Sequence, residues 1–265
     1  EMEEAAHVRR ALELDLREAI NSNQFHLAFQ PLVDLSTGRV TTCEALIRWV
    51  HPVRGTIPPS VFIPVAEETG MIIALGEWIL NQACLEAASW GNHVKVAVNL
   101  SPVQFKDAGL VLHVATALAK SGLRAQRLEL EITERLLLEE SEETLVAMGQ
   151  LRDLGVELSL DDFGTGYSSL NYLRKFPFHK IKIDQSFIRE RESDRDARAI
   201  IEAIANLGAS LEKTVVAEGI ETHGQMTMVK ELGVHEGQGY FFGRPMESDA
   251  IRAWLKSPPL EALVA

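Results

Sequence analysis

This chain of 265 residues has very little cysteine, no long apolar run and no excess of positive charge. Cys43 and Cys84 are its only cysteines, too few for a disulfide framework, so we predict a reducing, cytosolic setting. No run of 18 apolar residues and no secretory signal is visible, so we predict no membrane span and no membrane contact from this fragment. The net charge is −12, which argues against DNA as a partner, because such binding relies on Lys and Arg.

The composition that is present suits a folded domain. Apolar residues make up 46% of the chain, which is enough for a full core. The chain begins Glu1-Met2-Glu3-Glu4, which is typical of a fragment cut from a longer protein. Residues 3–20 have apolar residues at helical spacing. This segment is either a linker helix from an upstream domain or an ordinary first helix.

After this helix, short apolar strands alternate with helical patterns, which is typical of βα units. We predict eight strands, at 26–32, 41–49, 94–99, 128–133, 157–161, 180–184, 214–218 and 238–242. The main helices are predicted at 77–89, 110–120, 142–154, 196–211, 224–232 and 249–256. This order predicts an α/β fold of the (β/α)8 TIM-like barrel type, with residues 1–20 as the linker helix and 21–265 as the barrel domain.

One connection departs from the βα rhythm. The first two predicted strands are joined only by residues 33–40, which is too short for a crossover helix. We therefore expect a hairpin, with the first strand antiparallel to the second.

Two adjacent aspartates, Asp161 and Asp162, follow the apolar strand that ends at Leu160. Neighbouring side chains of a strand point to opposite faces, so both carboxylates serve one site only if the backbone turns there. Gly164 and Gly166 allow such a turn. Two adjacent carboxylates raise each other's pKa, and a divalent cation would remove that penalty. The alternative is a solvated Asp-Asp turn.

Unusual polar residues recur among the apolar residues of the other strands. They are Glu44, Asn99, Glu131, Lys182, Glu218 and Gln238. Taken singly, each has an ordinary explanation as a helix cap or a residue on a wet face. A (β/α)8 barrel, however, gathers the carboxyl ends of its strands around one mouth, where active sites lie. The shared register therefore predicts a single site.

The donor set indicates the kind of metal. Five carboxylates and one amide oxygen suit Mg²⁺, Mn²⁺ or Ca²⁺ better than zinc, and no histidine falls inside these motifs. So many carboxylates fit two cations better than one. Paired cations about 3.5–4 Å apart are a recurrent solution for phosphodiester hydrolysis.

Three further residues have roles that the pattern leaves open. Acidic neighbours should keep Lys182 protonated, so we expect it to orient a metal-bound hydroxide; the alternative is a salt bridge with Asp184 or Asp162. Arg48 follows Glu44 by four residues on the same face of the strand, where its guanidinium suits a phosphate. Arg48 and Gln30 are equally compatible with structural hydrogen bonds.

With these motifs in place, the chain resembles the EAL domain family of cyclic di-GMP phosphodiesterases, from about Leu14 to Leu255. The matching motifs are Gln30-Pro31, Glu44-Ala45-Leu46 with Arg48-Trp49, Asn99-Leu100-Ser101, Glu131-Ile132-Thr133-Glu134, Asp161 to Gly166, Lys182-Ile183-Asp184, Ala217-Glu218-Gly219 with Glu221, and Gln238-Gly239-Tyr240 with Gly243 and Pro245. The resemblance implies a barrel with one antiparallel strand. It also implies hydrolysis of one phosphodiester bond of cyclic di-GMP, giving linear pGpG.

The resemblance also implies residue roles. The metal ligands would be Glu44, Asn99, Glu131, Asp161, Asp162 and Glu218. Lys182 matches the residue that acts on the attacking water, and Glu221 matches a position that fixes a ligand or water. The substrate contacts would be Gln30, Leu46, Arg48, Asp184 and Gln238. Glu134 matches the residue that anchors the loop from Asp162 to Ser169.

Further expectations follow from the same resemblance. The cofactors would be two Mg²⁺ or Mn²⁺ ions, whereas Ca²⁺ should inhibit because its looser coordination holds water less well. We expect a homodimer in the bacterial cytoplasm, fused to an upstream cyclase-like (GGDEF) or sensor domain.

Three other functions share parts of this pattern. A cyclic di-GMP sensor without turnover is the main alternative, although all the matching catalytic positions are intact. An enolase-type carboxylate-metal barrel gives no reason for Gln30 or Arg48. A kinase interpretation of Asp162-Phe163-Gly164 fails, because no catalytic-loop signature precedes it.

Overall fold

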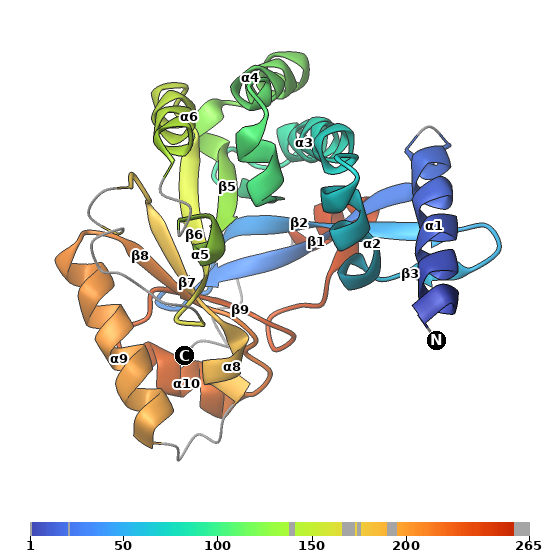
Figure 1. Cartoon of the computed structure of the whole chain (residues 1–265). Coiled ribbons are helices and arrows are strands. Elements are labelled where there is room, and N and C mark those ends of the chain that lie inside the picture. The colour runs from blue at the N-terminus through green and yellow to red at the C-terminus, as the bar shows by residue number, and fades with distance from the viewer. Residues whose placement is uncertain are drawn as a thin grey trace.

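Eight strands of this protein close into a barrel in the computed structural model (Figure 1). The structure describes residues 2–20, 22–137, 141–165, 173, 176–189 and 195–256, with side chains described from residue 9. The barrel strands are β1 (Phe25–Asp34), β2 (Val40–His51), β4 (Lys95–Leu100), β5 (Leu128–Thr133), β6 (Glu157–Phe163), β7 (Lys180–Ile183), β8 (Thr214–Ala217) and β9 (Glu236–Gln238). The ring closes because β1 pairs with both β2 and β9. The predicted (β/α)8 barrel is confirmed.

The strands form because their residues are buried on both faces. Strands β5, β7 and β9 contain only buried residues, apart from the last residue of β5. Parallel strands covered by helices have this pattern, because helices pack outside the barrel and side chains fill its interior. The covering helices are α3 (Ile72–Ala88), α4 (Leu110–Ser121), α6 (Glu142–Asp153), α9 (Arg195–Ser210), α10 (His223–Glu231) and α11 (Ser248–Trp254). Figure 1 shows α3, α4 and α6 along one side and α9 and α10 along another.

The predicted hairpin between the first two strands is also confirmed. Strands β1 and β2 run antiparallel, with Gln30 directly opposite Glu44. The Asp34 side chain accepts hydrogen bonds from the backbone of Ser36 and Thr37, and so closes the turn. The register matters for the site, because it places Gln30 beside a carboxylate of the second strand.

The prediction of the eighth strand was wrong in its position. That strand ends at Gln238, whereas the sequence predicted that it begins there. At Gly239 the chain leaves the sheet and packs on the backbone of Ile220, where a Cβ atom has no room. The apolar residues Phe241 and Phe242 pack against the core outside the sheet. Their apolar character is the reason that the sequence predicted a strand over these residues.

Several short elements were not predicted. These are β3 (Gly55–Ile57), α2 (Pro59–Glu68), α5 (Glu134–Leu137), α8 (Gln185–Arg189), β10 (Met246–Glu247) and two 3₁₀ helices, η1 (Pro102–Lys106) and η2 (Ala125–Arg127). Most of them contain five residues or fewer, which is too short for a periodic pattern to show. The ten-residue α2 begins at Pro59, where proline is tolerated, but it also contains Pro64 in its interior, so its sequence lacks a clear helical signal.

The first helix, α1 (Met2–Ala19), packs against α2 through Leu12, Leu16 and Ala19. The guanidinium of Arg54, in the turn after β2, donates to Asp15 of α1 at 2.9 Å. In Figure 1 the helix lies at the open end of the β1–β2 hairpin, opposite the turn that joins the two strands. Among the described residues, no helix combines the length and the apolar character needed to cross a membrane. The division of the chain at residue 20 stays a prediction.

Candidate active site

The interior of the barrel is charged near one end. Five polar side chains from five strands are buried there; they are Gln30, Glu44, Asp161, Lys182 and Gln238. A sixth, Glu131 of β5, is 1% exposed. In β5, β6 and β7 these residues lie near the carboxyl ends of parallel strands, as the sequence predicted.

Lys182 lies at the centre of this group and is fully buried. Its Nζ atom is 2.6 Å from Glu218, 2.8 Å from Glu131, 3.4 Å from Asp161 and 3.7 Å from Glu44. Burial alone would lower the pKa of Lys182, but the surrounding carboxylates outweigh burial and raise it well above its ordinary value. The lysine is therefore a fixed cation.

The salt-bridge alternative for Lys182 named Asp162 or Asp184 as its partner. Among the described residues, neither carboxylate lies within 4 Å of its ammonium group. Asp184 instead accepts a hydrogen bond from the backbone of Ser186 at 2.9 Å. Lys182 is thus shared among four carboxyl groups, and one ammonium charge cannot neutralise all four of them in their ionised forms.

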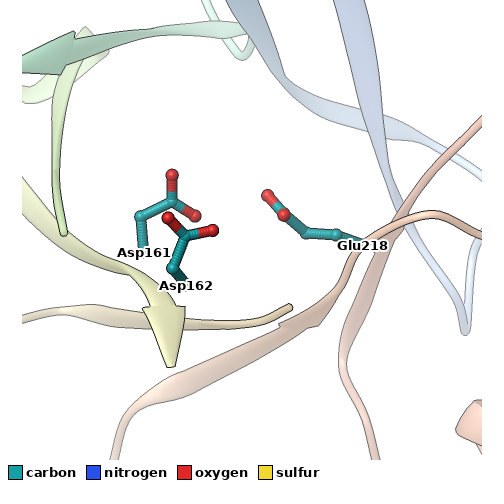
Figure 2. A group of neighbouring side chains, drawn as sticks. All are labelled: Asp161, Asp162 and Glu218. Carbon is teal, nitrogen blue, oxygen red and sulfur yellow. The ribbon is translucent and has the colours of Figure 1, made fainter. Parts of the chain in front are cut away.

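The backbone turns at the paired aspartates, as predicted, because Gly164 has φ +98°. Asp162 itself has φ +54°, in the left-handed region that Asp tolerates better than most residues. The turn brings carboxylate oxygens of Asp161, Asp162 and Glu218 within 4.8 Å of one another. Figure 2 shows the three side chains facing one space, two from the end of β6 and one from the segment after β8.

Amide groups hold the carboxylate of Glu44 in place. Asn99 donates to one of its oxygens and Gln238 to the other, both at 2.6 Å. Gln238 also lies 3.4 Å from the side-chain oxygen of Gln30. Burial would raise the pKa of Glu44, but Lys182 and the two amides lower it below its ordinary value. Glu44 is therefore ionised and oriented.

For three other carboxyl groups of the cluster, nearby positive charge and hydrogen bonds do not offset the cost of burying a negative charge, so their pKa values are raised. Burial, reinforced by Glu44, raises the pKa of Glu131 well above its ordinary value. Burial and Asp161 raise the pKa of Asp162 to about 6, and burial raises that of Glu218 to about 8 although Lys182 opposes the shift. Oxygen donors with unbalanced negative charge suit a hard divalent cation, so these residues fit the predicted metal site.

These shifts predict how the stability of the metal-free protein depends on pH. The ordinary pKa of Glu218 is 4.5 and its folded value is about 8, so the unfolded chain ionises first as the pH rises. The contribution of Glu218 to stability is therefore fully present below about pH 4.5 and is lost as the pH rises toward 8. We expect the free energy of unfolding to fall by on the order of 4 kcal/mol more in wild type than in Glu218→Gln across that range.

Chemical denaturation in a chelating buffer at pH 5 and pH 8 measures this difference. Equal pH dependence of the wild type and Glu218→Gln would contradict the shift. A saturating divalent cation should remove the difference, because cation binding holds the wild-type carboxylate in its ionised form.

Residues of the predicted metal site line two cavities. The larger has a volume of about 910 Å³ and is lined by Leu46, Arg48, Asn99 and Asp162, with apolar residues of α2, α3 and η1. The smaller, of about 210 Å³, is lined by Gln30, Glu44, Asp161, Glu218, Glu221 and Gln238. Most of the predicted site residues thus lie together, although Glu131, Lys182 and Asp184 line neither cavity.

Two predicted residues lie at the edge of the site. Glu221 is exposed and pairs with Arg189 of α8 at 3.6 Å. Glu134 accepts a hydrogen bond from the backbone N–H of Gly164 at 3.3 Å, which ties the start of α5 to the segment after Asp162. The remainder of the predicted loop, residues 166–169, lies outside the described residues.

The sequence did not indicate every residue around the site. Gln185 and Arg189 of α8 line the smaller cavity, and so does Tyr240, whose ring carries the guanidinium of Arg244 at 4.2 Å. Glu67 of α2 accepts a hydrogen bond from Ser101 at 2.6 Å, close to Asn99. Tyr240 belongs to the sequence motif Gln238-Gly239-Tyr240, so its position near the site could have been predicted. The helices α2 and α8 were not predicted, and nothing in the sequence therefore indicated that their residues lie near the site.

Similar proteins exist among curated sequences. The EAL domain family matches residues 13–245. The uncharacterised protein y4lL of Sinorhizobium fredii is 48% identical over 256 residues, which are 97% of this chain and 31% of that protein. The bifunctional diguanylate cyclase/cyclic di-GMP phosphodiesterase MucR of Pseudomonas aeruginosa is 43% identical over 254 residues, covering 94% of this chain and 37% of MucR.

A solved structure agrees with these relatives. A PaMucR phosphodiesterase in complex with c-di-GMP superposes with a TM-score of 0.87 at 43% identity, covering 91% of this chain and 99% of that one. The chain spans about a third of the length of the curated relatives that it matches. Because the family covers most of the chain and the folds agree, this protein is a member of the EAL domain family.

Proposed function

We propose that this domain hydrolyses one phosphodiester bond of cyclic di-GMP to linear pGpG, using two divalent cations. The observation that carries the proposal is the acidic cluster around Lys182, whose residues also line two cavities. Relatives that are named cyclic di-GMP phosphodiesterases, MucR and NbdA of Pseudomonas aeruginosa, add support at 43% and 40% identity.

The shape of the site suits a cyclic dinucleotide. Such a substrate has two nucleotide halves joined by two phosphates, so one phosphate can lie at the acidic cluster while the halves extend into separate cavities. Leu46 offers an apolar surface to a base in the larger cavity, and Arg48 offers a guanidinium to a phosphate. Gln30 and Gln238 present amides at the smaller cavity.

Divalent cations at the cluster would neutralise the phosphate and lower the pKa of the attacking water. Glu44, Asn99, Glu131, Asp161, Asp162 and Glu218 would hold them. Because two amides fix both oxygens of Glu44, that carboxylate keeps its direction before a cation arrives. Preorganised ligands of this kind reduce the reorganisation that the reaction would otherwise need.

Lys182 is better suited to orientation than to proton abstraction. Its pKa is raised, so it holds its protons at neutral pH and cannot accept another. From the centre of the cluster it forms ion pairs with carboxylates and can donate a hydrogen bond to the attacking oxygen. In the reaction this oxygen bonds to phosphorus, the bond from phosphorus to the 3′ oxygen breaks, and the 3′ oxygen takes up a proton.

The test is incubation of the purified domain with cyclic di-GMP and Mg²⁺, followed by separation of the products. We expect pGpG as the first product, no turnover in a chelator, and slow turnover with Ca²⁺. The alternative function, a sensor that binds the nucleotide without cutting it, predicts binding without pGpG under all three conditions. That result would overturn the proposal.

The larger assembly is also a proposal. The curated relatives are about three times as long as this chain, so we propose that the domain works as one module of a larger signalling protein. The homodimer, the upstream cyclase-like or sensor domain and the cytoplasmic location stay predictions.

A further inference from the structure

A second group of charged residues lies inside the barrel, beneath the acidic cluster. Lys180 of β7 contacts Glu129 of β5 at 2.9 Å and Glu236 of β9 at 3.0 Å. Its Nζ atom also lies 3.4 Å from the hydroxyl of Thr42 in β2. We call Lys180, Glu129 and Glu236 the lower charged layer; it joins three strands through one ammonium group.

These three residues are as buried as an apolar core. Glu129 is fully buried, and Lys180 and Glu236 are 4% and 8% exposed. Burial would lower the pKa of Lys180, but the two carboxylates raise it above its ordinary value, so the lysine is charged. An isolated ion in such a place would be unfavourable, and its partners must therefore be held close.

The layer stands in a fixed relation to the site. Side chains two residues apart on a strand point to the same face. Glu129 precedes Glu131 by two residues, Lys180 precedes Lys182 by two, and Glu236 precedes Gln238 by two. Each strand that the lower charged layer joins thus carries a residue of the proposed active site two positions later, on the same face.

Stability alone does not explain such a layer. Replacing a buried ion pair by well-packed neutral residues is often neutral or stabilising, so charge is not needed to fill this space. What charge adds is direction, because an ammonium group fixes the positions of the carboxylates that it contacts. A small shift of β5 or β9 would move Glu131 or Gln238, and Gln238 holds an oxygen of Glu44.

We propose that Lys180, through Glu129 and Glu236, is a positioning residue that sets the geometry of the cation-binding cluster above it. The inference rests on the proposed function, since the cluster it positions is the proposed site of phosphodiester hydrolysis. Residues that orient metal ligands typically contribute a factor of about 10–100 to metal affinity or activity.

The test compares three proteins. The first is wild type and the second carries Lys180→Met, Glu129→Gln and Glu236→Gln together, which removes all three charges and leaves no ion unpaired. The third is a control with Lys95→Met and Glu157→Gln. This pair joins β4 to β6 at 2.5 Å, but lies four residues before Asn99 and Asp161 instead of two.

Isothermal titration with Mn²⁺ gives a readout that needs no turnover. We expect the neutral-layer protein to bind Mn²⁺ about 10–100-fold more weakly than wild type at equal thermal stability. Its kcat should fall by a similar factor with little change in KM, and the control should match wild type within about twofold. A stable neutral-layer protein with wild-type Mn²⁺ affinity and kcat would overturn the inference.

Two single variants keep the test decisive if the triple variant does not fold. Lys180→Arg keeps the charge and should retain Mn²⁺ affinity within about threefold, whereas Glu236→Gln removes one contact and should lose about tenfold. Equal affinities in these two variants would also overturn it. If wild type binds Mn²⁺ but releases no pGpG, the proposed function fails while the Mn²⁺ comparison still decides the role of the layer.

Discussion

Asp161→Asn should abolish turnover of cyclic di-GMP while the barrel remains folded. The substitution keeps the shape of the side chain but removes a charge that lies 3.4 Å from Lys182 and close to Asp162 and Glu218. Because members of a catalytic unit act together, we expect kcat to fall by at least about 10³-fold. Initial rates at saturating Mg²⁺ measure this, with far-UV circular dichroism to establish that the fold is retained.

The matched control for this variant is Asp153→Asn. Asp153 ends α6, its side chain is 75% exposed, and it pairs only loosely with Arg152 at 3.5 Å. An exposed carboxylate of this kind contributes little, so the control should retain full activity. Near wild-type hydrolysis by Asp161→Asn would remove Asp161 from the proposed metal site.

Lys182→Met should have two separate effects. In the metal-free protein it leaves four carboxylates without their shared cation, and breaking a buried ion pair in this way costs roughly 3–5 kcal/mol of unfolding free energy. In the enzyme it removes the group that orients the attacking water, and kcat should fall by about 10²–10⁴-fold with little change in KM. Saturating Mg²⁺ should restore much of the lost stability, because it supplies positive charge to the same carboxylates.

Urea denaturation with and without Mg²⁺, together with steady-state kinetics, separates the two effects. Lys120→Met, which changes an exposed lysine of α4, is the control and should leave both measurements unchanged. A raised KM at an unchanged kcat would show that Lys182 contributes to binding alone. Such a result would contradict its proposed role at the attacking water.

The barrel and the location of the site could be predicted from the sequence for one physical reason. Parallel strands that are buried on both faces are almost wholly apolar, so Asn99, Asp161 and Lys182 stood out against their neighbours. The barrel topology then places the carboxyl ends of such strands around one mouth. The order of the predicted strands was therefore enough to predict that residues as distant in the chain as Glu44 and Gln238 would lie close together.

The lower charged layer could not be predicted in this way. In β5 the alternation Leu128-Glu129-Leu130-Glu131 is typical of a strand with one wet face. Both glutamates are buried instead, because a barrel encloses one face of the sheet and Lys180 meets Glu129 inside it. Strand sequence alone does not tell an enclosed polar face from one that is open to water.

Local backbone geometry was the other limit. The sequence indicated a turn at the paired aspartates through the following glycines, and Gly164 has φ +98°; it did not indicate that Asp162 also has the left-handed conformation. The end of β9 depends on the contact of Gly239 with the backbone of Ile220, which is distant in sequence. The two cavities depend on α2 and α8, which are short or contain proline and so lack a clear helical signal.

The most direct test is a crystal of the domain grown with Mn²⁺ and measured for anomalous scattering. We predict two peaks about 3.5–4 Å apart. They should lie among the oxygens of Glu44, Asn99, Glu131, Asp161, Asp162 and Glu218. An anomalous map without a peak between these side chains, at a Mn²⁺ concentration that supports turnover, would contradict the account.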